Sequence, residues 1–315
     1  MRCFGVTALA LLTLSTATSA VELDWATVRD PGNYGDIQIG QGWFGAVGYV
    51  YRISIFEITN SQYAEFLNAV AETDTNALYN TNMGWDFGGI TRTGSSGGYD
   101  YTPIAGRENM PVNYVSFYDS LRFANWLHNG QPTGTQGVTT TEDGAYTITP
   151  GGITANSITR NVGATVFLTS EDEWYKAAYY DVVTATYSFI PTPTDVRMTC
   201  AAPGATVNAA NCGSVVGDLT DVGSYTDTAS PNGTFDQGGN VWEWNEVIDD
   251  SSRGLRGGDF GLFLLTLEAS FQMHTSPTAE DSNIGFRVAS IPEPSADVLG
   301  IAGVLILAGL SWRRA

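Results

Sequence analysis

Few residues of this sequence have the types and spacing that enzymatic chemistry needs. Histidine occurs twice, at His128 and His274, and neither has a second histidine at metal-ligand spacing. His128 lies at the end of a predicted helix, where histidine commonly interacts with the terminal carbonyls. The sequence has no phosphate-binding loop. These residues therefore give catalysis little support.

The cysteines are the second candidates for chemistry. Cys3 lies in an N-terminal segment that we expect to be removed, which leaves Cys200 and Cys212. An even number of cysteines in an oxidising compartment predicts a disulfide. Closing so short a loop contributes about 3 kcal/mol in the chain-entropy model. Two free thiols are the alternative, because sequence alone does not test the distance between the Cα atoms.

Three helices are predicted to form the regular framework. Apolar side chains recur at helical spacing over residues 60–70 and 116–128, with Thr59 or Asn60 and Ser116 as N-caps. A capping box, with Ser170 at the N-cap and Glu173 at N3, opens a third helix through residue 178. Residues 164–168 and the alternating residues 145–149 are predicted strands. The glycine- and threonine-rich connections at 91–101 and 130–161 are predicted to be ordered by packing on one another.

Several blocks occur in an order that is typical of a known family. Residues 235–244 read Phe-Asp-Gln-Gly-Gly-Asn-Val-Trp-Glu-Trp, and they are followed by Leu-Arg-Gly-Gly-Asp at 255–259 and Asn-Ile-Gly-Phe-Arg-Val-Ala at 283–289. Further matching blocks lie at 56–63, 110–116 and 167–174. Together they resemble the formylglycine-generating enzymes, also called sulfatase-modifying factors. The resemblance spans most of residues 21–291 and implies an α+β, loop-rich, C-type-lectin-like fold.

The resemblance implies a calcium site at the first block. The family builds this site from an acidic or amide side chain, two backbone carbonyls and a glutamate. The matching positions are Asp236, the carbonyls of Gly239 and Val241, and Glu243. The residue types agree, because calcium takes about 6–8 oxygen ligands and a glycine-rich turn lets carbonyls converge. The alternative is a turn that is held by its aromatic residues and binds no metal.

A second family calcium site would fall on Asn211 and the carbonyl of Cys212. Its downstream carboxylate has no clear match, and Ser214 and Asp218 are imperfect candidates. The resemblance therefore implies this second site with an incomplete set of ligands.

The family's copper-dependent oxidation requires two cysteines between the Arg-Gly-Gly and Gly-Phe-Arg blocks. Leu264 and Ala269 stand at or near those positions. A thiolate must serve both as soft copper ligand and as redox partner, and neither residue supplies one. Copper and formylglycine-generating activity are therefore not expected. The tryptophans and Phe286 of the matching blocks are expected in the core, and Arg256 and Arg287 are expected to tie the turns together.

The two ends of the sequence read as processing segments. Residues 1–20 carry one arginine, an apolar run and a small-residue exit at Ala20, as in a signal peptide. Residues 292–315 contain Pro292-Glu293-Pro294, an apolar span of 15 residues and the terminal pair Arg313-Arg314. They resemble the PEP-CTERM sorting signal, which a membrane protease, exosortase, recognises. Such a span reaches about 22 Å, short of the roughly 30 Å hydrocarbon core, although a plain membrane anchor remains the alternative.

Charge and localisation follow from this organisation. The formal net charge is −19, and removing both segments takes away three arginines and two acids, leaving 11 basic and 31 acidic residues. Such a surface excludes nucleic acid as a partner. We expect export across the inner membrane of a Gram-negative bacterium, a transient membrane anchor, and C-terminal processing at the cell surface or in the extracellular matrix.

The expected function is that of a calcium-stabilised binding or extracellular-matrix module with one domain at residues 21–291. Its partners would be the exosortase-type protease and an extracellular ligand, either polysaccharide or protein. The alternative is an enzyme of another type that uses the region of Asp259, Glu268 and His274. A deep pocket with convergent polar groups there would favour the enzyme, and a shallow loop surface would favour the binding module.

Overall fold

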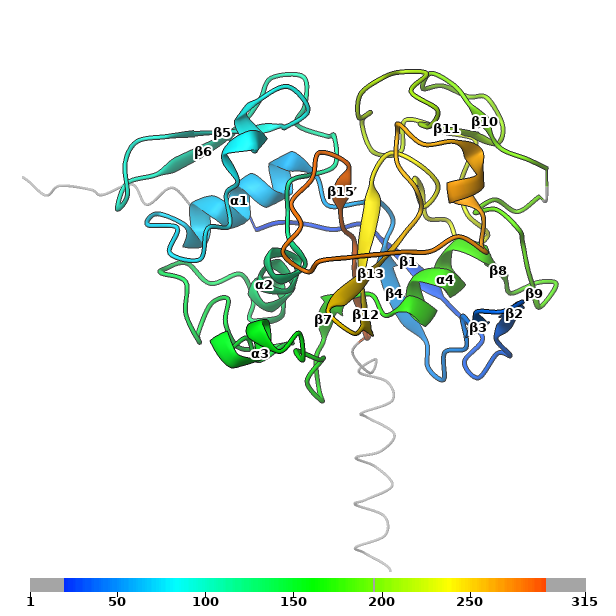
Figure 1. The fold of residues 1–315 in the computed structure, drawn as a ribbon, viewed down its shortest axis with the longest axis horizontal. Helices are drawn as coiled ribbons and strands as arrows, with labels where there is room; N and C mark the ends of the chain where they lie inside the picture. The colour runs from blue at the N-terminus through cyan, green and yellow to red at the C-terminus, as the bar shows by residue number, and fades with distance from the viewer. Residues whose placement is uncertain (1–19, 195, 293–315) are drawn as a thin grey trace, which may run out of the picture.

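A four-stranded antiparallel sheet joins the two ends of the folded chain. The structure is a computed structural model that describes residues 20–194 and 196–292. The strand order is β1 (Trp25–Val28), β4 (Tyr51–Ser54), β16 (Val288–Ser290) and β7 (Val166–Leu168). Figure 1 shows this sheet in the middle of the molecule, between a lobe that carries α1 to α3 and a lobe that carries β8 to β11. The expected strand at 164–168 is confirmed in its second half.

A second sheet carries the glycine-rich blocks. Its order is β14 (Met273–Thr275), β13 (Ser252–Arg256), β12 (Trp242–Asp249) and β15 (Ile284–Gly285). β12 pairs antiparallel with β13, and its first residues pair in parallel with β15. The Trp-Glu-Trp, Arg-Gly-Gly and Gly-Phe-Arg blocks therefore lie side by side although they are distant in sequence.

The three predicted helices are confirmed. They are α1 (Asn60–Val70), α2 (Phe117–His128) and α4 (Glu171–Tyr179). Each begins with a capping box, in which the cap hydroxyl accepts from the N3 amide and the N3 side chain accepts from the cap amide. The cap residues are Thr59, Ser116 and Ser170. Short helices add η1 (Thr81–Gly84), α3 (Pro150–Thr154) and η2 (Leu264–Leu267).

The remaining strands are short pairs. They are β2 (Asp36–Gln38) with β3 (Gly42–Phe44), β5 (Ile90–Thr93) with β6 (Asp100–Pro103), β8 (Tyr180–Asp181) with β9 (Thr186–Tyr187), and β10 (Thr199–Cys200) with β11 (Ala209–Ala210). The predicted strand at 145–149 is wrong, because there Tyr146 forms only an isolated bridge with Arg160. The Asn125 side chain instead bonds both the N–H and the C=O of Tyr146, at 2.7 and 2.9 Å. A side-chain amide thus takes the place of a partner strand.

Aromatic side chains fill the interior. Trp174, Trp242, Trp244 and Phe286 are fully buried, as expected from the sequence. The Trp244 indole donates to the Val115 carbonyl at 3.0 Å, which satisfies its polar atom inside the core. The family blocks are therefore mainly core, and they bring charged residues into it.

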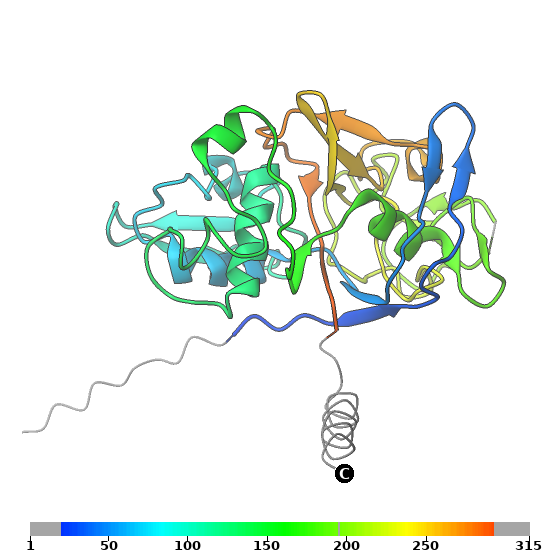
Figure 2. The ribbon, with the colours of Figure 1, turned by 90° about the horizontal axis from the view of Figure 1, so that it is seen from below.

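The described chain begins and ends on the same side of the molecule, as Figure 2 shows. Residues 1–19 and 293–315, which carry most of the expected signal peptide and sorting signal, lie outside the described residues. None of the helices that the structure describes has the length and apolarity needed to span a bilayer.

Candidate functional site

The glycine-rich turn before β12 brings backbone oxygens and carboxylates together. Asp236 and Asn240 adopt left-handed conformations, with φ of 59° and 61°. Gly239 has a φ of 96°, and a Cβ there would lie 2.3 Å from the Asn211 carbonyl oxygen. Only glycine permits this approach. Among the described residues, no hydrogen bond reaches the carbonyl oxygen of Gly239 or Val241.

Glu243 is committed to neighbouring donors. Its carboxylate is fully buried and accepts from Arg287 Nε and Nη2 at 2.5 and 2.7 Å. The Trp174 indole donates to the same carboxylate at 2.7 Å. Arg287 also donates to the carbonyls of Ser54 and Phe235, so it ties the turn to β4 as the sequence predicted. A calcium ion at this turn would have to share Glu243 with Arg287.

Asp236 and Glu57 add negative charge beside this pair. Asp236 Oδ2 accepts from the Gly223 amide at 2.6 Å, and its Oδ1 accepts no hydrogen bond from a described residue. Burial raises the pKa of Asp236 to about 6, with a further contribution from Glu243. Burial, then Asp236 and Glu243, raise the pKa of Glu57 well above its usual value. Sequence reasoning assigned Glu57 no role, because its partners come from blocks far along the chain.

The turn fits a calcium ion in part. It offers two free carbonyls and one free Asp236 oxygen, and three carboxylates face one guanidinium, so a cation would balance charge. Against this, Glu243 is occupied, and the cavity of about 10 Å³ beside Asp236 is bordered by Met198 and Tyr225 and not by Gly239. No three His, Cys, Asp or Glu side chains of the described chain converge as a metal site.

The residues of the second calcium set lie near one another, but several of their polar groups bond to protein partners. The Asn211 amide nitrogen donates to the Asp218 carbonyl at 2.9 Å and to Asn240 Oδ1 at 3.1 Å, while its buried Oδ1 has no partner. The Cys212 carbonyl accepts from the Val215 amide, and the Asp218 carboxylate binds Arg107 at 2.7 Å. Two of the expected oxygens are therefore already engaged.

The two positions that match the family's catalytic cysteines hold apolar residues, and the two residues lie in different surroundings. Ala269 is buried against Trp174 and Tyr179, and its carbonyl accepts from Arg256 Nη1 at 2.8 Å. Leu264 begins η2 and packs beside Cys200 and Cys212. Those two cysteines form a disulfide with Cα atoms 4.9 Å apart. The disulfide thus lies next to one of the positions where the family would carry a catalytic thiol.

The three residues of the alternative hypothesis, an enzyme of another type, each contact different neighbours. His274 Nδ1 lies 2.9 Å from Asp249 Oδ2, and its buried Nε2 has no partner. Asp259 accepts from the Gly261 amide and from Asn283 at 2.7 Å each, so it holds a turn. Glu268 lies 3.9 Å from Arg197. No described hydrogen bond or ion pair links Asp259, Glu268 and His274 to one another.

A groove of about 430 Å³ lies between β10 and η2. Its apolar lining includes Met198, Val215, Leu264 and the exposed Phe263 and Leu265, which are 77% and 57% accessible. The sequence did not predict it, because its walls come from segments at 197–200, 213–215 and 263–265 that carry no family motif. An exposed apolar groove of this size is typical of a binding surface.

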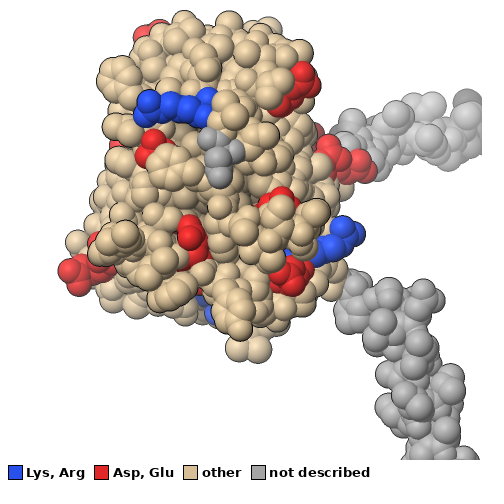
Figure 3. Space-filling view, turned by 90° about the vertical axis from the view of Figure 1, so that its right-hand side faces the viewer, with Lys and Arg blue, Asp and Glu red and all other residues tan. Residues whose placement is uncertain are grey.

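The rim of the groove carries Arg197, whose side chain is 68% exposed. Among the described residues only Arg29 and Arg197 are exposed cations. Figure 3 views the side that lies to the right in Figure 1 and shows small blue patches among red and tan. On a protein of net charge −19, Arg197 is an exposed positive charge that has only one loose acidic partner, Glu268 at 3.9 Å, and it can attract an anion.

One edge of β10 is free. Thr199 and Ala201 donate their amides toward β11, so the alternation of a strand turns the Cys200 amide and carbonyl the other way. Neither Cys200 group has a hydrogen bond to a described residue. An extended peptide could bond to such an edge.

Comparison with known proteins supports one family. The model of the sulfatase-modifying factor enzyme 1-like domain matches residues 47–291. The chain is similar in structure to CarF, with a TM-score of 0.56 and 19% identity over 86% of this chain and 99% of that one. It is also similar to Treponema denticola variable protein 1, with a TM-score of 0.56 and 18% identity over 88% and 98%. A search of curated proteins found no match.

Proposed function

The chain belongs to the family of sulfatase-modifying factor enzyme 1-like domains, and on that premise we propose that it is an exported binding module that holds an extended peptide. The loop-rich α+β, C-type-lectin-like fold is that of the family. The proposal separates the fold from the family's reaction, because function resides in the site that a fold carries.

The observation that carries the proposal is the groove beside Leu264. Where the family would place a thiol, this chain has an apolar wall, with exposed Phe263 and Leu265 continuing it. Apolar side chains of a ligand would be removed from water there, at about 25 cal/mol per Å² of buried area. This chemistry suits an apolar peptide better than a polysaccharide.

The free strand edge and the positive charge at the groove indicate which backbone conformation and which charge a bound peptide would have. The free edge at Cys200 offers one donor and one acceptor to an extended chain. Arg197 at the rim would attract a carboxylate. We therefore propose an extended apolar peptide that carries an acidic side chain or a C-terminal carboxylate.

The position of the groove suits surface display. In Figure 1, β10 lies at the top of the molecule, and the chain leaves β16 at the bottom. If the sorting segment at 292–315 holds the protein at a membrane until exosortase-type processing, the groove faces outward. Export, sorting and localisation at the surface of a Gram-negative bacterium remain part of this proposal.

A peptide-binding measurement tests the groove. We expect a fluorescent apolar hexapeptide with a free C-terminal carboxylate to bind the purified protein, and its amidated form to bind several-fold more weakly. Leu265→Asp should weaken binding at least tenfold, and Arg197→Glu should remove the preference for the carboxylate. Val162→Asp, a fully exposed site outside the groove lining, is the matched control. Equal binding by wild type and Leu265→Asp would contradict the proposal.

A second assay tests the family's reaction directly. We expect no conversion of cysteine to formylglycine in a sulfatase-type peptide incubated with the protein, copper and oxygen, because Leu264 and Ala269 supply no thiolate. Aldehyde detected by mass spectrometry above a no-protein control would show that the chain is an oxidase after all.

Calcium belongs to the proposal as a structural ion. The ion would take one oxygen of Asp236, the carbonyls of Gly239 and Val241, and one oxygen of Glu243 shared with Arg287. There it would supply positive charge to three buried or partly buried carboxylates and join the turn to β12. The excess of carboxylates over guanidinium supports this assignment.

A further inference from the structure

The first residues that the structure describes are held by the loop after α2. Val21 is 7% exposed and belongs to the main core cluster. Its amide donates to Gln131 Oε1 at 2.6 Å, and Gln131 Nε2 donates back to the Val21 carbonyl at 2.8 Å. Gln62 on α1 donates to the next carbonyl, that of Glu22, at 3.1 Å. The first residues of a domain are usually poorly ordered unless they are tied down, and here three hydrogen bonds tie them.

Gln131 is fixed in an unusual conformation. Its φ is 60°, in the left-handed region that residues other than glycine seldom adopt. Its amide donates to the Trp126 carbonyl at 2.9 Å, and it follows Gly130 at the end of α2. The surroundings must hold such a residue in place. The side-chain amide that clamps Val21 is therefore positioned by the fold.

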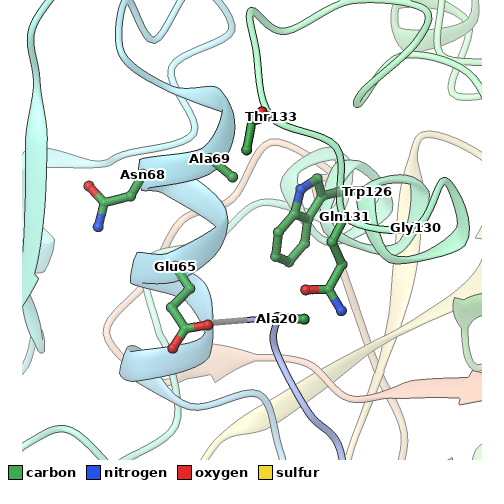
Figure 4. Close-up of a pocket in the computed structure, with 8 residues that line it drawn as sticks. All are labelled: Ala20, Glu65, Asn68, Ala69, Trp126, Gly130, Gln131 and Thr133. Atoms are coloured by element: carbon green, nitrogen blue, oxygen red, sulfur yellow. The ribbon is translucent and has the colours of Figure 1, made fainter. Parts of the chain in front are cut away.

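A cavity of about 240 Å³ adjoins this clamp. Ala20, Glu65, Trp126, Gln131 and Thr133 contribute to its lining. Figure 4 shows Glu65 reaching toward Ala20 from α1, with Gln131 on the other side. Glu65 is the only ionisable residue of the lining; it is exposed to solvent, and partial burial raises the pKa of its carboxyl.

We propose that this cavity is a capture site for the α-ammonium group that forms when signal cleavage separates Ala20 from Val21. The inference rests on the export proposal, since cleavage makes the group. Hydrolysis adds one water across the amide bond: the Ala20 carboxylate leaves with residues 1–20, and the Val21 nitrogen takes up protons to become an ammonium group.

Cleavage changes what the Val21 nitrogen can do. Before cleavage it carries one hydrogen, which Gln131 accepts. Afterwards it carries three, so one stays on Gln131 while the others point into the space that Ala20 leaves, toward Glu65. The new positive charge would meet a carboxylate there and no described cation. One additional residue would move the amine by up to about 3.5 Å and destroy the match.

The labelling rate of the Val21 α-amine tests whether the ammonium group is bound. Lys176 is the chain's only lysine and is fully buried, but burial lowers its pKa to about 8, so labelling by an amine-reactive reagent at neutral pH is read by mass spectrometry on the peptide that begins at Val21. We expect a chain that starts at Val21 to be labelled about three- to tenfold more slowly than a free Val-Glu-Leu-Asp-Trp peptide. The reason is that a paired carboxylate favours the ammonium form, and one pKa unit is tenfold in free amine.

Matched variants assign the effect to the cavity. Glu65→Gln should restore most of the labelling rate, and a chain that starts at Ala20 should be labelled like the free peptide. The other acids of this segment are Glu22 and Asp24, and Glu22→Gln should leave the rate unchanged. Gln131→Leu should speed labelling and lower the melting temperature, whereas Glu65→Gln should change mainly the labelling.

Two results would overturn the inference. One is equal labelling of the Val21 chain, its Glu65→Gln variant and the peptide, which shows that no capture occurs. The other is an exported protein whose sequenced N-terminus lies elsewhere than Val21. Because the labelled chain is produced directly with Val21 first, failure of capture and failure of the predicted export signal are read separately.

Discussion

The glycine-rich turn and the groove use their side chains in opposite ways. At the turn, Glu243 and Arg287 are fully buried, and each makes several hydrogen bonds inside the domain. At the groove, Phe263 and Leu265 are exposed, and the free edge of β10 has no partner among the described residues. The turn resembles the family closely, while the groove carries none of its motifs. The family motifs in this chain therefore supply residues that stabilise the fold. The surface that could bind a ligand is formed by residues outside those motifs.

This difference predicts a large energetic gap between two arginines. Arg287→Ala should lower the free energy of unfolding by about 3–5 kcal/mol, because it leaves the buried Glu243 carboxylate without its guanidinium. Arg197→Ala, at an exposed pair 3.9 Å from Glu268, should change it by less than about 1 kcal/mol. Urea unfolding of the three proteins measures both. Similar losses for the two variants would erase the distinction between the regions.

Local sequence patterns predicted part of the structure around the turn and the helices. The N-cap at Ser116, the capping box at Ser170 and the burial of Trp242 follow from local patterns, and the structure confirms them. The ion pair of Arg287 with Glu243 could not be predicted, since it depends on how β12 and β15 pair. Local pattern also failed at residues 145–149, where the amide of Asn125 replaced a strand.

The pH dependence of stability should differ between variants in the glycine-rich turn and variants in the groove. The pKa of Asp236 is raised to about 6 in the folded protein, above its usual value near 3.9. The folded state therefore holds the proton more tightly, so this contribution is present below about pH 4 and is lost as pH rises through about 6.

In calcium-free buffer, we expect Asp236→Asn to flatten the fall in stability between pH 4 and 7 by up to about 3 kcal/mol, at 1.36 kcal/mol per pKa unit. Groove variants such as Leu265→Ala should keep the wild-type slope. Denaturation midpoints at several pH values provide the measurement. A wild-type slope retained in Asp236→Asn would place the titration elsewhere.

Calcium should act on the turn alone. An ion that binds only the native state at about a hundred times its Kd adds roughly 2.7 kcal/mol, so EDTA should lower the melting temperature of the wild type. Asp236→Asn should blunt this response, while Asp227→Asn, an exposed acid outside the turn, should not. An unchanged melting temperature, with no calcium found by elemental analysis, would reduce the turn to a loop held by Arg287 and its aromatic residues.

The groove could not be predicted because its walls meet only after folding. Met198, Val215 and Leu264 are separated by long stretches of sequence, and no local periodicity marks them as one surface. The same distance effect hid Gln131, whose side chain meets Val21 across 110 residues. Sites made by long-range packing of loops leave no motif in a single sequence.

The smallest predicted change in stability, that of Leu265→Ala, gives the most direct test of the comparison between core and groove. Leu265 and Leu267 lie two residues apart in η2, with 57% and 0% of their surfaces exposed. Leu267→Ala should cost about 2–5 kcal/mol, because it opens a cavity against Ile190 and Met198. Leu265→Ala should change stability by no more than about 0.5 kcal/mol, as exposed positions do, and yet weaken peptide binding. If Leu265→Ala destabilises the fold as much as Leu267→Ala, the groove wall is part of the core. The outward-facing site would then not exist.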